Sequence, residues 1–447
     1  MFRLPHAAQF LLLFAPVFTA PTFGNAMVLL VGAILVKQRR TITNMVYGAG
    51  DLADGDLSKY HRVFNRAPWV LRHAARILAR LLVEIDPDRL WVRVAIDCTV
   101  AEHKGRKVYG KGCHHDAVRS TQTHKVWRWG HRWVVLAIVV DLPFCSRPWA
   151  LPVLAGLYRP RKVNEEEGRR HKTPIEIARG LMATLMHWFP DKKFVFLGDG
   201  GYASHDLAKF CSRHGQRAAL VSKFSADAGL YDPPPKKQEG RGRRRVKGRK
   251  RLTPAQVVEK QGLHPTVAKW YGVFDRDLEV CDGHGNWYKS GKGLVAVHWV
   301  FLRDVTGTRR DEYYYTTHTD FTAEEIVALY TTRWTIEITF QELRAHLGLE
   351  TPQQRVEKAV LRMTPCLMGL FSIVTLIYHE HRKRCSLKTC KRPGYTKDEA
   401  TFTDAMTAVR RLFWEETIFA QPYFCKASKK MPPKLREFLM DHLCQAA

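Results

Sequence analysis

The order of apolar and polar positions divides the chain into helical and sheet-forming regions. Residues 1–85 predict helices: over 69–84, for example, apolar residues recur near helical spacing with basic residues between them. Short apolar runs after this region predict strands, and Thr173-Pro174 predicts the start of a helix at 174–189. We place the strands at 91–100, 105–110, 133–142, 193–198 and 217–222. Three strands, a helix and two more strands predict an α/β fold with antiparallel and parallel pairing.

A second sheet-forming region follows, and then a helix with a clear start. Apolar runs separated by glycines predict a β-rich block over residues 266–319. Thr322 and Glu325 fit a capping box and Gly348 fits a helix end, so we expect one helix over roughly 323–347.

Two long apolar stretches have the composition of membrane spans. The first lies between Arg3 and Lys37, but Pro16 and Pro21 divide it into pieces too short to cross roughly 30 Å of hydrocarbon. The second, at 356–378, is interrupted by an arginine and a proline. We therefore expect a buried helical region for the first stretch, a buried or dimer-facing helix for the second, and no membrane association.

The charge of the chain indicates a polyanionic partner. The 71 Lys and Arg residues outnumber the 43 Asp and Glu residues, which gives a net charge of +28. Basic side chains that contact phosphates release condensed counterions, so this surplus favours a nucleic acid as the partner. A basic protein that is merely soluble is the alternative.

The strongest basic run follows three prolines at 233–235. Ten of the sixteen residues from Lys236 to Arg251 are Lys or Arg, so the segment cannot bury itself and predicts a loop. It is either a solvated linker or a set of phosphate contacts. The candidates for DNA contact are Arg243, Arg244, Arg245 and Lys247.

The cysteines give no sign of a zinc site. Ten occur, with no C-x2-C pair, and the adjacent trio Cys113-His114-His115 cannot surround a tetrahedral ion. We expect this trio to be structural or exposed. Scattered thiols fit a reducing cytosol.

Three acidic residues far apart in the chain are the candidates for a catalytic site. Asp97 and Asp199 follow apolar strands, and Gly200 and Gly201 let the chain turn sharply after the second. Glu337 lies on the helix after the β-rich block. Carboxylates at the ends of neighbouring strands meet at one sheet edge, so we expect the three acids to converge.

The helix with Glu337 also carries a polar stripe. At about 100° per residue, Tyr330, Arg333, Glu337 and Arg344 fall within an arc of about 60°. The alternative is an ordinary ion pair between Arg333 and Glu337, which stabilises a helix by only about 0.3–0.5 kcal/mol.

Three converging carboxylates repel one another. Without a cation, the site is therefore expected to be poorly ordered or partly protonated. Two Mg²⁺ or Mn²⁺ ions about 3.5–4 Å apart would neutralise it, activate a water or a DNA 3′-hydroxyl, and stabilise the leaving oxygen at phosphorus. Oxygen ligands alone favour Mg²⁺ over zinc.

At these residues the chain resembles the DDE transposases of bacterial insertion sequences, in the group marked by Y-x2-R-x3-E-x6-K. The signature is formed by Tyr330, Arg333, Glu337 and Arg344, with Arg in place of the final Lys. Arg keeps the charge but presents a planar fork. Further similarities are Ile96-Asp97-Cys98-Thr99, Tyr109–His115, Gly198–Tyr202 and Gln353-Gln354-Arg355.

The resemblance implies an RNase H-like mixed-sheet core, interrupted by a β-rich insertion and flanked by helical domains. It gives Asp97, Asp199 and Glu337 the metal-binding and catalytic roles, and Tyr330, Arg333 and Arg344 a grip on DNA phosphates. The implied boundaries are 1–88 (DNA-binding helices), 89–228 (first part of the core), 229–320 (basic loop and insertion), 321–350 (glutamate helix) and 351–447 (C-terminal helices).

The expected function is cut-and-paste transposition by a homodimer on paired DNA ends, with terminal inverted repeats bound and 3′-hydroxyls joined to target DNA. In relatives with such an insertion, a hairpin step uses an aromatic side chain that stacks on a flipped base. Candidates here are Trp287, Trp299 and Tyr313–Tyr315, for which burial in strands is the alternative. Two other functions remain open: a non-catalytic or domesticated DNA-binding regulator, and an RNase H-like nuclease without strand transfer.

Overall fold

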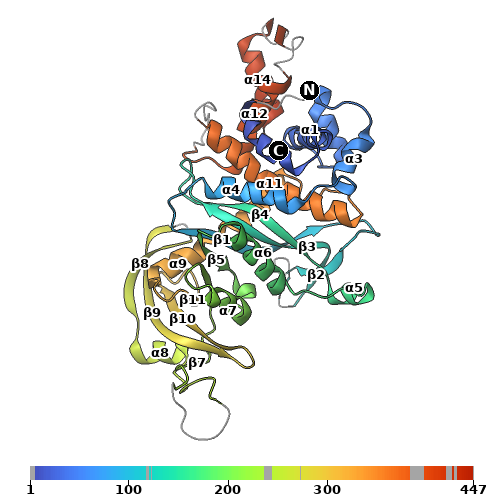
Figure 1. The fold of residues 1–447 in the computed structure, drawn as a ribbon. Helices are drawn as coiled ribbons and strands as arrows, with labels where there is room; N and C mark the ends of the chain where they lie inside the picture. The colour runs from blue at the N-terminus through green and yellow to red at the C-terminus, as the bar shows by residue number, and fades with distance from the viewer. Residues whose placement is uncertain are drawn as a thin grey trace.

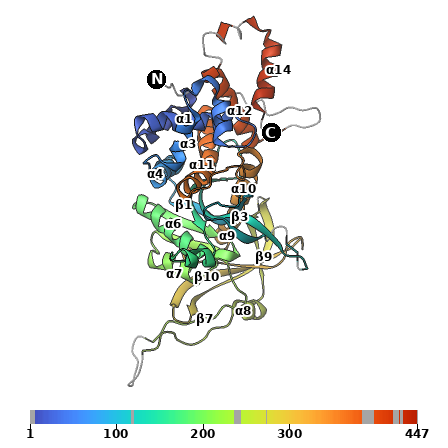
Figure 2. The ribbon, with the colours of Figure 1, turned by 90° about the vertical axis from the view of Figure 1, so that its right-hand side faces the viewer.

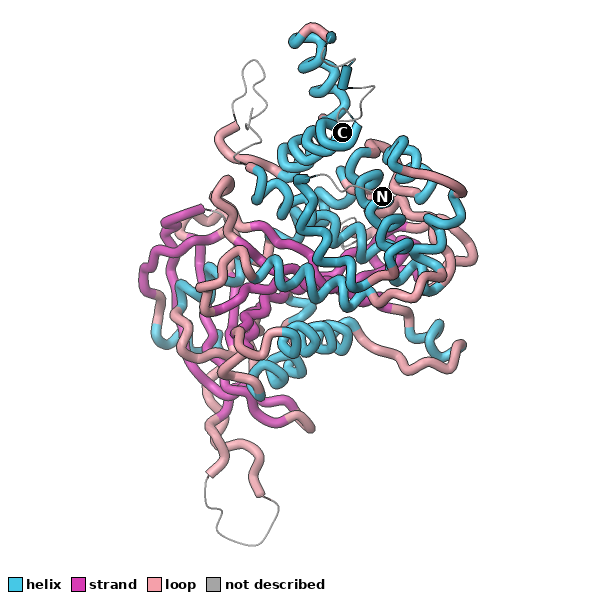
Figure 3. The backbone as a smooth tube through the Cα atoms, turned by 45° about the horizontal axis from the view of Figure 1, so that its top comes forward, coloured by secondary structure: helices cyan, strands magenta, loops and turns pink. Residues whose placement is uncertain are grey.

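The computed structural model describes residues 6–116, 120–121, 123–235, 244–271, 273–382, 397–418, 425–426 and 430–445. Within these residues, one eleven-stranded mixed sheet runs through the molecule (Figure 1). Helices pack on both of its faces, as expected for a sheet whose strands are apolar on both sides (Figure 3). The predicted α/β class is confirmed.

The N-terminal region is helical, as predicted. Its helices are η1 (His6–Val17), α1 (Ala20–Leu35), α2 (Ile42–Ala49), η2 (Gly50–Leu52), α3 (Leu57–Asn65) and α4 (Leu71–Val83). The apolar stretch divides where expected, because Pro21 lies in the first turn of α1 and η1 ends before it. Gly32 lets α1 approach α2 closely: an added Cβ would lie 1.7 Å from the carbonyl oxygen of Met45.

The first part of the sheet combines antiparallel and parallel pairing. Its strands are β1 (Trp91–Glu102), β2 (Gly112–Asp116), β3 (Val126–Val140), β4 (Trp149–Tyr158), β5 (Lys193–Gly198) and β6 (Ala218–Lys223). β3 runs antiparallel to β1, β2 and β4, whereas β1, β5 and β6 are parallel neighbours. The helices between these strands are α5 (Arg161–Glu166), α6 (Pro174–Trp188) and α7 (His205–Arg213).

One strand prediction here was wrong, and two strands, β2 and β4, were not predicted. Residues 105–110 form a loop, because Gly110 takes a positive φ of 70° and turns the chain before β2 begins. β4 contains Pro152, a residue that is unfavourable within a strand. The proline is tolerated because it lies at an irregularity in the β3–β4 register, between Leu136 and Ala137.

The β-rich block is continuous with the core sheet. Its elements are β7 (Leu230–Tyr231), α8 (Pro254–Gln261), β8 (His264–Trp270), β9 (Val273–Lys289), β10 (Gly293–Asp304) and β11 (Glu312–Thr316). The predicted β-rich block is confirmed. β11 pairs with β6, so the block extends the same sheet (Figure 1).

Of the helices that follow, the first packs mainly on strands of the insertion, the next two pack on β4, and the last ones pack on other helices. These helices are α9 (Ala323–Thr332), α10 (Thr335–His346), α11 (Glu357–His381), α12 (Phe402–Phe413), a π-helical turn (Trp414–Ile418) and α14 (Pro433–Cys444). Figure 1 shows α4 and α11 on one side of β4 and α6 on the other. Figure 2 shows α12 and α14 at the same end of the molecule as α1.

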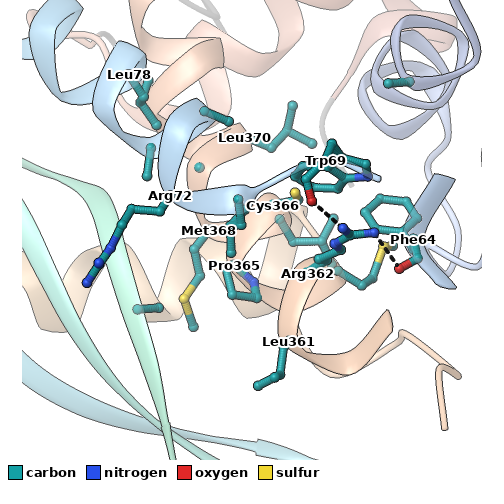
Figure 4. Close-up of a pocket in the computed structure, with 18 of the residues that line it drawn as sticks. Phe64, Trp69, Arg72, Leu78, Leu361, Arg362, Pro365, Cys366, Met368 and Leu370 are labelled. Carbon is teal, nitrogen blue, oxygen red and sulfur yellow. Dashed lines mark hydrogen bonds between the residues drawn. The ribbon is translucent and has the colours of Figure 1, made fainter. Parts of the chain in front are cut away.

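Helix α11 corresponds to the second apolar stretch. Its length and composition would allow it to cross a membrane, but 67% of its most apolar window is buried inside the protein. Its Arg362 donates hydrogen bonds to the carbonyls of Phe64 and Trp69, which ties α11 to the end of α3 (Figure 4). An apolar cavity of ≈ 630 Å³ lies beside this contact.

Candidate active site: carboxylates on two neighbouring parallel strands

The first two candidate acids lie side by side. Ile96 of β1 pairs with Gly198 of β5 in parallel register, and Asp97 and Asp199 are the next residues on the two strands. Adjacent strands are separated by about 4.8 Å, so this register brings the two side chains to the same position on the same face.

The turn after β5 holds Asp199 in place. The Asp199 carboxylate accepts a hydrogen bond from the Gly201 amide at 3.0 Å, and its carbonyl accepts one from Ser222 Oγ at 2.9 Å. Gly198 is required by space, because an added Cβ would lie 2.7 Å from Cβ of Tyr202. Thus the glycines of Gly198–Tyr202 allow a tight turn that fixes the carboxylate.

The third acid lies on a broken helix. The predicted capping box between Thr322 and Glu325 is present, but the single helix expected over 323–347 is interrupted at Arg333 and Trp334. The amides of residues 333, 334, 336 and 337 bond three residues back rather than four, which overwinds the chain locally.

Threonine side chains account for the break. The hydroxyls of Thr331 and Thr332 both donate to the carbonyl of Ala328, and Thr335 donates to that of Thr332. Hydroxyl bonds to carbonyls of the preceding turn bend helices. The bend allows α10 to pack on β1 and β4, where the Thr339 hydroxyl donates to the Ala150 carbonyl at 2.7 Å.

Arg333 joins the helix acid to the strand acids. One guanidinium nitrogen lies 2.9 Å from Oε1 of Glu337 and 3.5 Å from Oδ2 of Asp97. The side chain is 5% exposed. Burial opposes its charge, but Tyr330, Glu337 and Asp97 outweigh burial and raise its pKa. The guanidinium is therefore a permanent cation between two carboxylates.

Asp97 lies where a negative charge is unfavourable. Burial and then the neighbouring Asp199 carboxylate raise its pKa to about 7, against the opposing effect of Arg333. Near neutral pH a large fraction of Asp97 is therefore protonated when the only cation nearby is Arg333. This agrees with the partly protonated site expected from converging acids.

The other two members of the polar stripe, Tyr330 and Arg344, contact strands of the sheet. Tyr330 is 1% exposed and stacks on Tyr314 with ring centroids 3.9 Å apart. Arg344 donates to the Thr99 hydroxyl and, at 3.4 Å, to the Val100 carbonyl of β1. In this conformation neither Tyr330 nor Arg333 lies on the surface, and Arg344 links α10 to the strand that carries Asp97.

The donors suit a hard divalent cation, whereas their spacing in this structure does not yet form a complete site. Carboxylate oxygens are the ligands that Mg²⁺ prefers. Within the residues that the structure describes, no three acids, histidines or cysteines are close enough together to hold one ion. Arg333 contacts both Asp97 and Glu337, so a metal bound by both would have to displace it.

The basic loop lies apart from the acids. β7 and α8, which flank it, lie at the end of the insertion away from β1 in both views (Figures 1 and 2). Arg243 falls outside the described residues, and Arg244 and Arg245 are exposed. Lys247 packs between the rings of Tyr231 and Tyr288, 4.1 Å from each centroid.

The aromatic candidates of the insertion lie in the sheet. Trp299, Tyr314 and Tyr315 are at most 1% exposed, and Trp287 and Tyr313 are half-buried. The exposed tryptophans of the described residues are elsewhere, at Trp127, Trp129 and Trp334. Sequence reasoning missed them, although alternation in Val126–Gly130 is a signal for exposure.

The trio Cys113-His114-His115 lies on β2. Strand alternation leaves Cys113 and His115 exposed and buries His114. The expected structural and surface placement is confirmed for the described residues.

Two family models match the chain. One, described as "DDE superfamily endonuclease", matches residues 13–272, and the other, described as "Archaeal putative transposase ISC1217", matches residues 286–377. No curated protein matches the chain. A solved structure titled as the piggyBac transposase synaptic complex with hairpin DNA is 9% identical, covers 95% of this chain and 75% of its own, and has a TM-score of 0.40, too low to support any argument. Since the first family model spans more than half of the sequence, the protein belongs to the DDE superfamily endonucleases.

Proposed function

We propose that this protein is a DNA transposase that cuts element ends and joins their 3′-hydroxyls to target DNA. The observation that carries the proposal is the placement of two strand acids side by side, with a helix acid linked to them by a shared arginine. Asp97 and Asp199 occupy adjacent positions of neighbouring parallel strands, and Arg333 contacts both Asp97 and Glu337.

Other features support the same function. The sheet order β3–β1–β5–β6, with β3 antiparallel, fits an RNase H-like core. Family membership favours an endonuclease and a transposase. The net charge of +28 favours a DNA partner.

The three acids would hold divalent ions, for which Mg²⁺ or Mn²⁺ fits the oxygen donors. Such ions activate the attacking hydroxyl or water and stabilise the leaving oxygen at phosphorus. The chain itself supplies the positions: β1 and β5 fix two carboxylates, and the bend before α10 delivers the third. Arg333, once released from the acids, is placed to pair with a DNA phosphate.

The remaining parts of the proposal concern DNA handling. The N-terminal helices would bind terminal inverted repeats, two protomers would assemble on paired ends, and a hairpin step is one route to excision. Tyr330 and Arg344 would position the glutamate helix, because Tyr330 contacts β11 and Arg344 contacts β1. Both residues would also contact DNA. A cytoplasmic, nucleoid-associated location follows from these partners.

The test is cleavage of DNA with matched terminal repeats by purified full-length protein. D97N, D199N and E337Q are each expected to lower metal-dependent cleavage by about 10³-fold or more, because charge on the metal ligands is lost. Each variant should still bind the DNA. An exposed acid of the insertion offers a control, D311N, which should cut as well as the unmodified protein.

The outcome separates the competing functions. Wild-type rates in any of the three acid variants would remove that residue from the site. Binding without any cleavage in Mg²⁺ or Mn²⁺ would favour a regulator. Cleavage without joining of precut ends to target DNA would favour a simple nuclease.

A further inference from the structure

Two tryptophans stand exposed at one end of the sheet. Trp127 and Trp129 are 59% and 58% exposed, although burying rings of this size is strongly favourable. They lie two residues apart on β3, so their side chains are on the same face, and they pair with His115 and Cys113 of β2. Large exposed rings that are grouped in this way indicate a binding surface.

This surface continues the face of the sheet that carries the candidate active site. In an antiparallel ladder, paired residues point to the same side, and Asp97 pairs with Val135 of β3. Val135 and Trp129 are both odd-numbered residues of β3, so Trp129 and Asp97 share a face. Six residues of strand separate them along β3, a distance of about 20 Å.

The surroundings of the two rings are cationic. From His103 to Val135 the chain has eight Lys and Arg residues and one acid, Asp116. Lys111 Nζ lies 5.3 Å from the centre of the Trp129 ring, and the His115 ring contacts that of Trp127 with centroids 5.5 Å apart.

A loop brings more charge to the same place. The amide of His103 donates to the carbonyl of Trp129, which holds the loop after β1 against this end of β3. Lys104, Arg106 and Lys107 of that loop are exposed. A second copy of so basic a surface would be repelled, so the charge favours a polyanion as the partner.

We propose that Trp127 and Trp129 form a stacking platform for unpaired DNA bases, with the phosphates of the same strand held by the lysines and arginine of the neighbouring loop. Aromatic rings within a basic groove bind single strands in this manner, because every base has a flat face. Side chains two apart on a strand are about 7 Å apart, which is two base steps of about 3.4 Å. The platform rests on the proposed function, since it would hold the unpaired tail of a DNA end about six base steps from Asp97.

The test compares two DNA probes by fluorescence anisotropy with the full-length protein. One probe is a blunt 20-base-pair duplex, and the other is the same duplex with a five-nucleotide 3′ thymine extension. The double variant W127A/W129A is expected to lose about 10-fold or more in affinity for the extended probe, and less than about two-fold for the blunt one. W127F/W129F, which keeps two rings, should retain most of the difference.

The control is F438A, which removes a ring that is 56% exposed on α14 and should leave both affinities unchanged. Thermal unfolding of each variant checks that the fold is kept. Equal losses on both probes, or no loss on the extended one, would overturn the platform. A change in the sedimentation of DNA-free W127A/W129A would also overturn it, because this face would then join two copies.

The result can be separated from that for the proposed function. D97N lacks a candidate metal ligand but keeps the platform, so it should prefer the extended probe as the unmodified protein does. If D97N cleaves normally while the tryptophan effect holds, the catalytic assignment fails and the platform stands. If D97N is inactive while W127A/W129A binds both probes normally, the platform alone fails.

Discussion

The strand acids and the helix acid of the site are held by different physical means. Asp97 and Asp199 are placed by backbone hydrogen bonds of two central parallel strands, which leave their relative position little freedom. Glu337 follows a helix break and is held by one ion pair to Arg333. The strand pair is therefore a rigid half of the site, and the helix acid is an adjustable half.

The difference shows why Arg333 is buried. The rigid half brings two like charges together and raises the pKa of Asp97 to about 7, so it needs a cation nearby. The adjustable half supplies that cation four residues before its own carboxylate. In this structure Arg333 neutralises the carboxylates that metal ions would neutralise when bound.

The largest effect on stability is expected from R333A. Removing the guanidinium leaves Asp97 and Glu337 without a counter-charge, which should destabilise the metal-free protein by about 3–5 kcal/mol at pH 8. Millimolar Mg²⁺ should restore much of the loss, because the ion takes over the same carboxylates. Denaturant unfolding with and without Mg²⁺ measures both effects.

The matched control for R333A is R303A. Arg303 forms an exposed ion pair with Asp311 at 2.9 Å, and exposed pairs contribute about 0–1 kcal/mol. If R333A lost no more stability than R303A, or if Mg²⁺ gave it no extra protection, the two halves of the site would not be linked by this arginine.

A smaller effect, dependent on pH, is expected from D97N. Because the pKa of Asp97 is raised in the folded protein, the native state holds a proton that the unfolded chain has released, and stability falls as pH rises from about 4 to about 7. D97N removes this loss, so above pH 7 the metal-free variant should be more stable than the unmodified protein by roughly 2–4 kcal/mol. Urea unfolding from pH 5 to 8.5 in EDTA tests this.

Asp304, in the insertion, has a pKa shifted in the opposite direction. Burial disfavours the charge of Asp304, but hydrogen bonds from Arg276, Thr308 and Thr306 outweigh burial and hold its pKa well below the usual range. D304N should therefore destabilise the protein above the usual pKa of an aspartate. Parallel pH profiles for D97N and D304N would contradict the assigned environments.

The smallest effect is expected from R344K. Arg344 donates from Nη2 to Thr99 and Val100 of β1 and from Nη1 to the Phe340 carbonyl, and the single ammonium of a lysine cannot replace both nitrogens. The loss should be about 1 kcal/mol, with a larger loss in cleavage rate than in DNA affinity because Glu337 becomes less precisely placed. Unchanged cleavage with weakened DNA binding would make Arg344 a DNA contact instead.

Local signals in the sequence were enough for much of this site. The apolar run before Asp199 predicted β5 at its observed bounds, and Thr173-Pro174 predicted the start of α6, where a capping box is formed. The spacing of Tyr330, Arg333 and Glu337 indicated one functional cluster. These features depend on residues close together in the chain, which is why they could be predicted.

Features that depend on distant residues could not be predicted in the same way. Pro152 is unfavourable within a strand, and its place beside a register irregularity is set by β3. The position of α10 after the helix break depends on its packing against β1 and β4. Tyr330 has a polar side chain, and only the contact with Tyr314 on β11 shows why it is buried.

The pairing of β6 with β11 has a mechanical consequence. A ladder of hydrogen bonds stretches without interruption from the outermost strands of the insertion to β5, the strand that ends at Asp199. A tilt imposed on the outer strands, for instance by a ligand bound at that end, would be transmitted as a twist of the whole sheet. The distance between the rigid and adjustable halves could then respond to a load applied far from either of them.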